Sequence, residues 1–267
     1  MADETKRPSA LITGASVGIG EGFARHLAKR GYDLVLVARR KDRLDTLAAE
    51  LSSEHSVSCD VLGADLVQEE GVSAVEERLR SGGIDLLVNN AGFGTVGAYV
   101  ELPLNRELAQ IDLNVRALVR LTHCALEVMV PLKRGAIINV ASMAGFQAIP
   151  YNATYAATKA FVLHFSEAVH EEAKEHGITV TCLCPGPVRT EFQQVAGIEE
   201  AGVPAMAWTT VDTVVDSALS AMRSRRAIAI PGAFNAATAV GSRLMPRALT
   251  RRIAASFFKD RGRTGDA

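Results

Sequence analysis

A tyrosine and a lysine stand four residues apart in the segment Tyr155-Ala-Ala-Thr-Lys159, and Ser142 precedes the tyrosine by thirteen residues. On a helix, residues four apart share one face, so the lysine ammonium would lie beside the phenol. A free tyrosine has a pKa of about 10 and is a poor base at neutral pH, but a neighbouring positive charge favours the phenolate. We therefore expect Tyr155 to have a lowered pKa and to exchange protons with a substrate, with the Ser142 hydroxyl close by.

A glycine-rich segment near the start of the chain, Thr13-Gly-Ala-Ser-Val-Gly-Ile-Gly20, has the composition of a phosphate-binding turn. Glycines permit a tight strand-to-helix bend and let backbone N–H groups approach a pyrophosphate at the helix N-terminus. Close packing alone can also produce this pattern, so the motif by itself is a weak signal. Its place in the first strand–helix unit favours a dinucleotide held by Gly14, Ser16, Gly18, Ile19 and Gly20.

Two arginines, Arg39 and Arg40, end the second apolar run, where many dinucleotide-binding folds carry an acidic residue for the ribose 2′-OH. A guanidinium can instead hold a 2′-phosphate through charge-assisted hydrogen bonds, which favours NADP(H) over NAD(H). The alternative is that both arginines only begin a solvated helix. Asp65, with Leu66 beside it, follows the third run. It could accept a hydrogen bond from an adenine amino group or cap the next helix.

Seven short apolar runs alternate with longer segments of helical periodicity, which predicts parallel strands covered on both faces by helices. We expect an α/β, three-layer, doubly wound Rossmann-type fold with a seven-stranded, mainly parallel sheet in one domain over residues 1–267. One predicted helix ends at Gly31, and another begins at a variant capping box, Thr209 to Asp212. The predicted strands are 10–13, 34–38, 56–62, 84–88, 136–140, 178–184 and 227–230. Asn90, Ala91 and Gly92 follow the fourth run, at the carboxyl edge where a cofactor would lie.

Composition excludes several functional classes. The net charge of −1 gives no drive toward nucleic acid, and no stretch of 18 apolar residues is present to span a membrane. The N-terminus has no apolar segment of a secretory signal, and the four cysteines have no CxxC spacing. Cys182 and Cys184 could ligate a metal, but buried thiols are the better interpretation because no further ligand is near them. We expect a cytoplasmic protein without a metal site.

The C-terminal tail is basic, with seven basic and two acidic residues from Arg243 to Ala267. Leu249, Ile253 and Phe257 recur at helical spacing, so residues 234–260 predict a basic amphipathic helix. Such a helix can pack on the body or in an oligomer, cover a lipophilic substrate entrance, or lie on an anionic membrane surface. A solvated tail is the remaining alternative.

Taken together, these motifs resemble those of the short-chain dehydrogenase/reductase family over residues 8–230, which we expect to form the Rossmann core. The resemblance rests on the glycine turn, Asn89 to Gly92, Asn114 within Leu-Asn-Val, Ser142, the Tyr155–Lys159 pair and the segment Pro185-Gly-Pro-Val-Arg-Thr190. It implies that Tyr155 is the acid in carbonyl reduction, that Lys159 lowers its pKa and binds the nicotinamide ribose, and that Ser142 holds the substrate oxygen. It also implies that Asn114 supports a water that feeds protons to Lys159. The residues implied at the nicotinamide end are Pro185, Gly186, Val188 and Thr190.

The resemblance places a substrate lid at residues 191–208, with Gln193, Gln194 and Trp208 facing the substrate. It further implies an NADP(H)-dependent oxidoreductase acting on a lipophilic 3-oxoacyl or steroid-like ketone, assembled as a homodimer or homotetramer. Reduction of small polar ketones is one alternative. A cofactor-sensing protein without turnover is another, although a sensor has no need for the Ser142, Tyr155 and Lys159 set.

Overall fold

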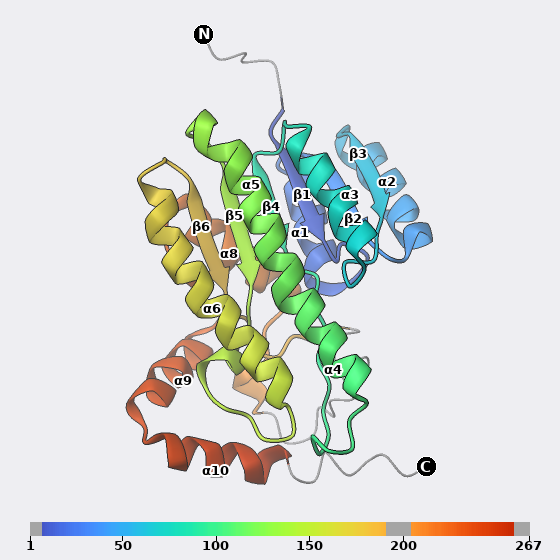
Figure 1. Ribbon diagram of the computed structural model, residues 1–267. Helices are drawn as coiled ribbons and strands as arrows, with labels where there is room; N and C mark the ends of the chain where they lie inside the picture. Colours follow the sequence, from blue (N-terminus) through green and yellow to red (C-terminus); the bar gives the residue numbers. More distant parts are fainter. Residues whose placement is uncertain (1–6, 191–203, 259–267) are drawn as a thin grey trace.

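The computed structural model describes residues 7–190 and 204–258 of the chain (Figure 1). Seven strands form one sheet in the order β3-β2-β1-β4-β5-β6-β7, and all of the six neighbouring pairs are parallel. The predicted α/β fold is therefore confirmed. The strands are β1 Ser9–Thr13, β2 Asp33–Ala38, β3 Cys59–Gly63, β4 Leu86–Asn89, β5 Ala136–Val140, β6 Thr179–Leu183 and β7 Ile228–Ala229.

Helices cover both faces of the sheet because successive strand residues point to opposite sides. Ile12 of β1 packs with α1, α2 and α8, whereas its neighbour Leu11 packs with α3 and α5 on the opposite side. The longest helix, α6, lies beside α5 in front of the sheet in Figure 1 and packs against β6. The bounds are α1 Gly18–Ala28, α2 Lys41–His55, α3 Glu69–Arg80, α5 Leu118–Leu132, α6 Ala153–Lys174 and α8 Val211–Arg223.

Two predicted boundaries differ from the structure. The predicted third strand began at residue 56, but Ser56 has a φ of 55° and ends α2 in the left-handed conformation, so β3 begins only at Cys59. The capping box predicted at Thr209 is shifted by one residue. Thr210 is the N-cap of α8, and its hydroxyl accepts a hydrogen bond from the Thr213 amide.

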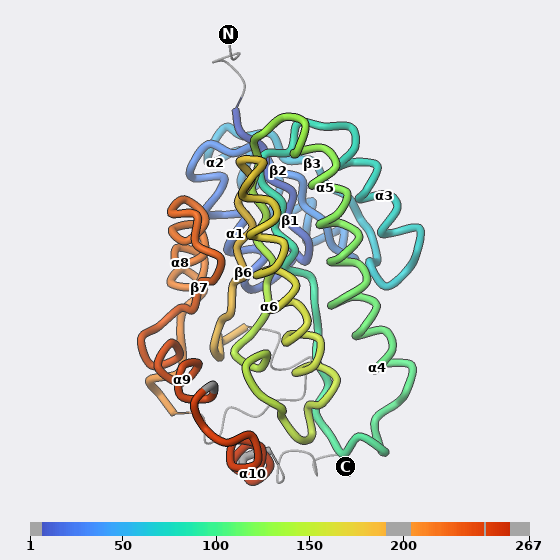
Figure 2. The backbone as a smooth tube through the Cα atoms, turned by 60° about the vertical axis from the view of Figure 1, so that its left-hand side comes forward, coloured from blue at the N-terminus to red at the C-terminus, as the bar shows by residue number. Residues whose placement is uncertain are grey.

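The smaller elements gather beyond the carboxyl ends of the strands, at the bottom of Figures 1 and 2. They are helix α4 Leu104–Ile111, the π-helical turn η1 Asp112–Ala117, the 3-10 turns η2 Met143–Phe146 and η3 Ala205–Ala207, and helices α9 Ala233–Leu244 and α10 Arg247–Phe258. The strand order reverses between β1 and β4. In open parallel sheets this switch point is where ligands bind, so these elements surround the expected site.

The tail forms two helices rather than the single helix predicted. Met245 is the C-cap of α9, and Pro246 separates it from α10 because proline does not continue a helix. Helix α10 buries Thr250 and Ala254, while Leu249 and Ile253 are about half exposed. Within the described residues, no helix combines the length and apolar character needed to cross a bilayer.

Candidate active site

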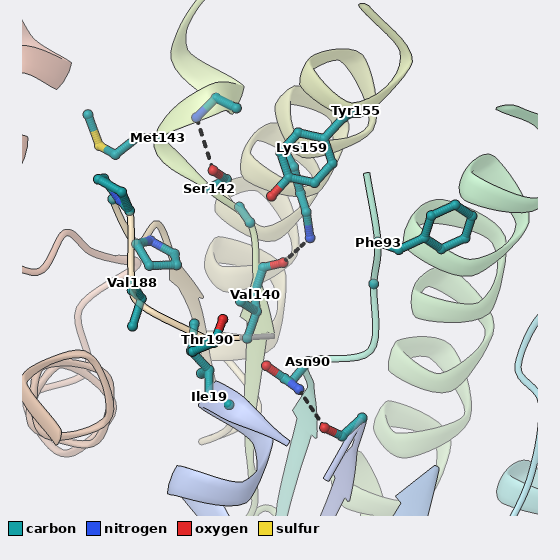
Figure 3. Close-up of a pocket in the computed structure, with 18 of the residues that line it drawn as sticks. Ile19, Asn90, Phe93, Val140, Ser142, Met143, Tyr155, Lys159, Val188 and Thr190 are labelled. Carbon is teal, nitrogen blue, oxygen red and sulfur yellow. Dashed lines mark hydrogen bonds between the residues drawn. The ribbon is translucent and has the colours of Figure 1, made fainter. Parts of the chain in front are cut away.

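A cavity of about 710 Å³ lies at the carboxyl edge of the sheet and contains most of the predicted site residues (Figure 3). Gly20 and Asn114 are absent from its lining, and Gln193 and Gln194 fall outside the described residues. The predicted residues that line it are Gly14, Ser16, Gly18, Ile19, Arg39, Arg40, Asp65, Leu66, Asn90, Ala91, Gly92, Ser142, Tyr155, Lys159, Pro185, Gly186, Val188, Thr190 and Trp208.

The glycine-rich turn between β1 and α1 has the shape of a phosphate cradle. Gly14 and Gly18 have φ values of 67° and 62°, a conformation that favours glycine. A Cβ on Gly20 would stand 2.1 Å from the Gly14 carbonyl oxygen, so the helix start packs directly on the turn. Residues 16–19 of this turn and helix start line the cavity, and the first amides of a helix have no partner within it, so the residues present fit the pyrophosphate of a dinucleotide.

The adenosine end of the cavity carries positive charge from Arg39 and Arg40. Arg39 is exposed at the end of β2, and Arg40 donates a hydrogen bond to the Ser16 hydroxyl at 3.3 Å. Asp65 caps no helix, because Gln68 is the N-cap of α3 and Asp65 instead accepts from the Val67 amide at 3.1 Å. Two arginines beside one turn-forming carboxylate suit a phosphorylated ribose.

A small hydrogen-bond network joins β1 to β4 at the switch point. The Thr13 hydroxyl accepts from the Asn90 and Ala91 amides at 3.0 Å each, and the Asn90 side chain donates to the Thr13 and Gly14 carbonyls. Figure 3 shows Asn90 facing the turn from the neighbouring strand. The network fixes the Asn90–Gly92 segment against the glycine turn.

Three elements bring Ser142, Tyr155 and Lys159 together. Ser142 follows β5 as the N-cap of η2, where its Oγ accepts from the Ala144 amide at 3.1 Å. Tyr155 and Lys159 come from the first turns of α6, and Lys159 Nζ donates to the Val140 carbonyl at 2.7 Å. The same Nζ lies 5.7 Å from the centre of the Tyr155 ring. In Figure 3 all three side chains point into one space.

Burial dominates the protonation of this pair. It raises the pKa of Tyr155 to about 12, and a hydrogen bond with Ser142 opposes that rise in part. It lowers the pKa of Lys159 to about 8, with a smaller opposing effect of Cys182 and Cys184. The expectation of a lowered Tyr155 pKa is therefore wrong for this structure, because removal from water disfavours the phenolate more than the Ser142 hydrogen bond favours it. The phenol is therefore protonated at neutral pH.

Asn114 lies in the π-helical turn η1, a type of turn that is frequent at functional sites. Its amide donates to the Phe93 carbonyl at 2.9 Å and to the Thr158 hydroxyl at 3.1 Å, and its oxygen accepts from the Phe93 amide at 3.1 Å. A Cβ on Gly92 would stand 2.9 Å from Asn114 Oδ1 and 3.4 Å from Lys159 Nζ. Asn114 is thus close to the lysine and clamps the loop after β4.

The far end of the cavity was predicted only in outline, through Trp208 and through the alternative in which the tail covers a lipophilic entrance. Phe146 of η2 and residues of both tail helices form this wall, and no local motif marks them. Asn235 anchors α9 there by donating to the Ala207 and Pro231 carbonyls at 3.1 and 3.0 Å. The tail residues that line the cavity are Phe234, Asn235, Thr238, Ser242, Ile253 and Ala254.

Cys182 and Cys184 lie buried in and just after β6, with their sulfur atoms 3.7 Å apart. Among residues 7–190 and 204–258, no three histidine, cysteine or acidic side chains gather closely enough to hold a metal ion.

The chain belongs to the short-chain dehydrogenase family, whose model, described as short chain dehydrogenase, matches residues 8–201. It is an oxidoreductase of that family. The chain is 32% identical over 235 residues to a very-long-chain 3-oxoacyl-CoA reductase of Anas platyrhynchos, with 84% of this chain and 72% of the relative covered. A reductase with the same name from Bos taurus is 33% identical over 70% of this chain, but the match spans only 61% of that relative.

Solved structures extend the likeness over almost the whole chain. A short-chain dehydrogenase from Sphingobium yanoikuyae in complex with NADPH is 38% identical, with a TM-score of 0.81 and coverage of 97% and 98% of the two chains. A bulky-bulky ketone specific alcohol dehydrogenase from Comamonas testosteroni is 33% identical, with a TM-score of 0.78 and 98% of both chains covered. A 7beta-hydroxysteroid dehydrogenase is 25% identical, with a TM-score of 0.84 over 93% of this chain and 96% of that one.

Proposed function

We propose that the protein is an NADPH-dependent reductase of bulky, lipophilic ketones. One observation carries the proposal. A single cavity runs from Arg39 and Arg40, past Ser142 and Tyr155, to an apolar wall that includes Phe234. A phosphorylated cofactor and a large apolar substrate can therefore share it, with the proton donor between them.

The cofactor would lie along the carboxyl edge of the sheet. The glycine turn from Gly14 to Gly20 would hold the pyrophosphate, and Arg39 and Arg40 would bind the 2′-phosphate. Asp65 and Leu66 would contact the adenine. The nicotinamide end would lie against Asn90, Ala91, Gly92, Lys159, Pro185, Gly186, Val188 and Thr190, all of which line the cavity. NADPH bound there supplies a hydride.

Ser142 and Tyr155 would perform the remaining chemistry. Both hydroxyls can donate a hydrogen bond to the carbonyl oxygen of a ketone placed between them. As the carbonyl carbon gains a hydride, Tyr155 transfers its phenolic proton to the oxygen, and the alcohol forms. The phenolate that remains is stabilised by Lys159, whose pKa of about 8 also lets it return a proton near neutral pH. Proton transfer of this kind accelerates reactions by roughly 10² to 10⁴.

The apolar wall supports a lipophilic substrate over a small polar one. Phe146, Trp208, Phe234 and Ile253 line the cavity beyond the hydroxyl pair, together with Thr238 and Ser242, and no carboxylate lies among the described residues that line this end. A polyhydroxylated or charged ketone would leave polar groups without partners against these rings, which costs free energy. Arg189 stacks over Trp208 at 4.9 Å and fixes that ring.

The solved relatives named above point in the same direction, since one is named for bulky ketones and another for a hydroxysteroid. The tail then forms part of the substrate pocket, which is the entrance-covering alternative for residues 234–260. The lid over residues 191–208, the homodimer or homotetramer, the peripheral membrane contact and the cytoplasmic location stay predictions.

NADPH consumption tests the proposal. We would measure absorbance at 340 nm with four substrate classes: ketones with large apolar groups on both sides, steroid ketones, 3-oxoacyl thioesters of graded chain length, and small polar ketones. The proposal expects turnover of at least one bulky class with a kcat/KM well above that of the polar ketones. Preference for the polar ketones, or equal use of NADH, would contradict it.

A further inference from the structure

A buried polar cluster beneath α4 has no part in the reaction described so far. Glu107 is 3% exposed and Gln110 is fully buried, although both are polar. The Thr95 hydroxyl donates to Glu107 Oε1 at 2.6 Å. Among the described residues, Glu107 Oε2 and both amide atoms of Gln110 have no hydrogen-bond partner.

Such an arrangement is costly for folding. A buried carboxylate with one oxygen unpaired, beside a buried amide with both groups unpaired, lowers stability relative to apolar side chains of the same size. The Glu107–Thr95 bond recovers only part of that cost. Buried polar groups without partners persist mainly where they serve a function. Because Thr95 is the hydrogen-bond partner of Glu107, the contacts of Thr95 indicate what that function is.

Thr95 belongs to the loop that packs on the Tyr155 ring. Its neighbour Gly94 is so close to that ring that a Cβ there would stand 2.9 Å from Tyr155 Cδ2. The Thr95 carbonyl accepts a hydrogen bond from the side chain of Asn152, and the Gly97 amide donates to the Tyr151 carbonyl at 2.8 Å. Asn152 is the N-cap residue of α6, the helix that carries Tyr155.

Three side chains therefore hold this loop in place by hydrogen bonds. Glu107 fixes it to α4 through the Thr95 hydroxyl, and Asn152 fixes the same residue to the start of α6. Asn114 clamps its beginning through Phe93. Because Gly94 presses directly on the ring, displacement of Thr95 would change the space in which the phenol can turn.

We propose that Glu107 is a positioning residue for Tyr155 and acts through Thr95 and Gly94. The inference rests on the proposed function, since it assigns Glu107 the task of holding the proton donor of that reaction. Glu107 does not line the cavity. Its hydrogen bond keeps the loop against the ring, so that the Tyr155 hydroxyl faces the carbonyl oxygen within the narrow geometry that proton transfer requires.

A set of variants separates positioning from stability. Thr95→Val removes the donor and leaves Glu107 unpaired, so both the melting temperature and kcat should fall, the latter about tenfold for a small displacement of the phenol. Thr95→Ser keeps the donor and should rescue both quantities. The double variant Thr95→Val/Glu107→Met replaces the pair by apolar groups, and it should regain the melting temperature without regaining kcat. Cofactor Kd should be unchanged throughout.

A double variant that regains both stability and kcat would overturn the inference, because the pair would then be structural only. So would a Thr95→Val enzyme with the kcat of the wild type. If the wild type reduces no ketone, the proposed function fails by itself, and a second readout still tests the cluster. In protein with ¹³C-labelled tyrosine, the Tyr155 signal, assigned with Tyr155→Phe among the four tyrosines, should shift in Thr95→Val and return in Thr95→Ser. An unmoved signal would refute the link to the ring.

Discussion

Lys159 should destabilise the folded protein at neutral pH, in proportion to the fall in its pKa. Burial lowers that pKa from its ordinary value of 10.5 to about 8. A shift of this size corresponds to about 3 kcal/mol, because each pKa unit is worth about 1.4 kcal/mol. Substitution by methionine removes the penalty and also the hydrogen bond to Val140, worth about 1 kcal/mol. The Lys159→Met variant should therefore be more stable than the wild type by about 2 kcal/mol at pH 7.

The pH dependence of folding stability shows whether the buried charge of Lys159 is destabilising. Between pH 8 and pH 10.5 the unfolded chain keeps the lysine proton and the folded chain has released it. Wild-type stability should therefore rise with pH across this window, relative to Lys159→Met, and the deficit of about 2 kcal/mol should be made up after about 1.5 pH units and reverse by about 1 kcal/mol at the upper end. Above pH 10 the raised pKa of Tyr155 reverses the trend, since the folded state then holds the extra proton.

Urea unfolding of the cofactor-free protein at pH 6.5, 8 and 9.5 provides the assay. Lys174→Met is the matched control, because Lys174 belongs to the same helix and its side chain is 64% exposed. The control should track the wild type at every pH. A Lys159→Met protein that is less stable than the wild type at pH 6.5, or a difference that stays constant with pH, would refute the reasoning.

Three further predictions follow from the cavity and its turn. Arg39→Ala should weaken NADPH binding by about 1.5–3 kcal/mol and leave NADH binding unchanged in fluorescence titrations, and equal losses for both cofactors would contradict the 2′-phosphate contact. Gly20→Ala places a Cβ 2.1 Å from the Gly14 carbonyl and should lower the melting temperature and NADPH affinity, whereas Gly241→Ala on α9 meets nothing within 4 Å and should be neutral or stabilise by up to about 1 kcal/mol. Phe234→Ala should raise KM for bulky ketones while KM for small ketones stays the same, and a uniform rise would argue against a substrate wall.

The fold and the chemistry could be predicted because their signals are local in sequence. Strand runs, the glycine turn and the four-residue spacing of Tyr155 and Lys159 each report on neighbours along one element. The parallel sheet then brings the carboxyl ends of β1, β4 and β5 to one edge, so residues that follow different strands meet without any long-range signal. The predicted Rossmann-type sheet and family were confirmed for this reason.

The differences arise where the outcome depends on packing. The pKa of Tyr155 rises because burial outweighs the hydrogen bond with Ser142, and burial cannot be read from spacing alone. Phe234 and Ile253 line the cavity only because α9 and α10 fold back over it, and the helical spacing that marks Ile253 left open what the tail covers. The burial of Glu107 also depends on packing. In the sequence Glu107 looks like an ordinary carboxylate on a helix surface, and the loop around Thr95 is what buries it.

The role of Tyr155 as the proton donor is tested most directly by the single-turnover rate of ketone reduction in Tyr155→Phe with saturating NADPH. The substitution removes the phenolic proton and keeps the ring that packs on Gly94. The rate should be lower by roughly 10² to 10⁴ with the Kd for NADPH unchanged, as expected when a general acid is lost. A Tyr155→Phe rate within a few-fold of the wild type would contradict the assignment of Tyr155 as the proton donor.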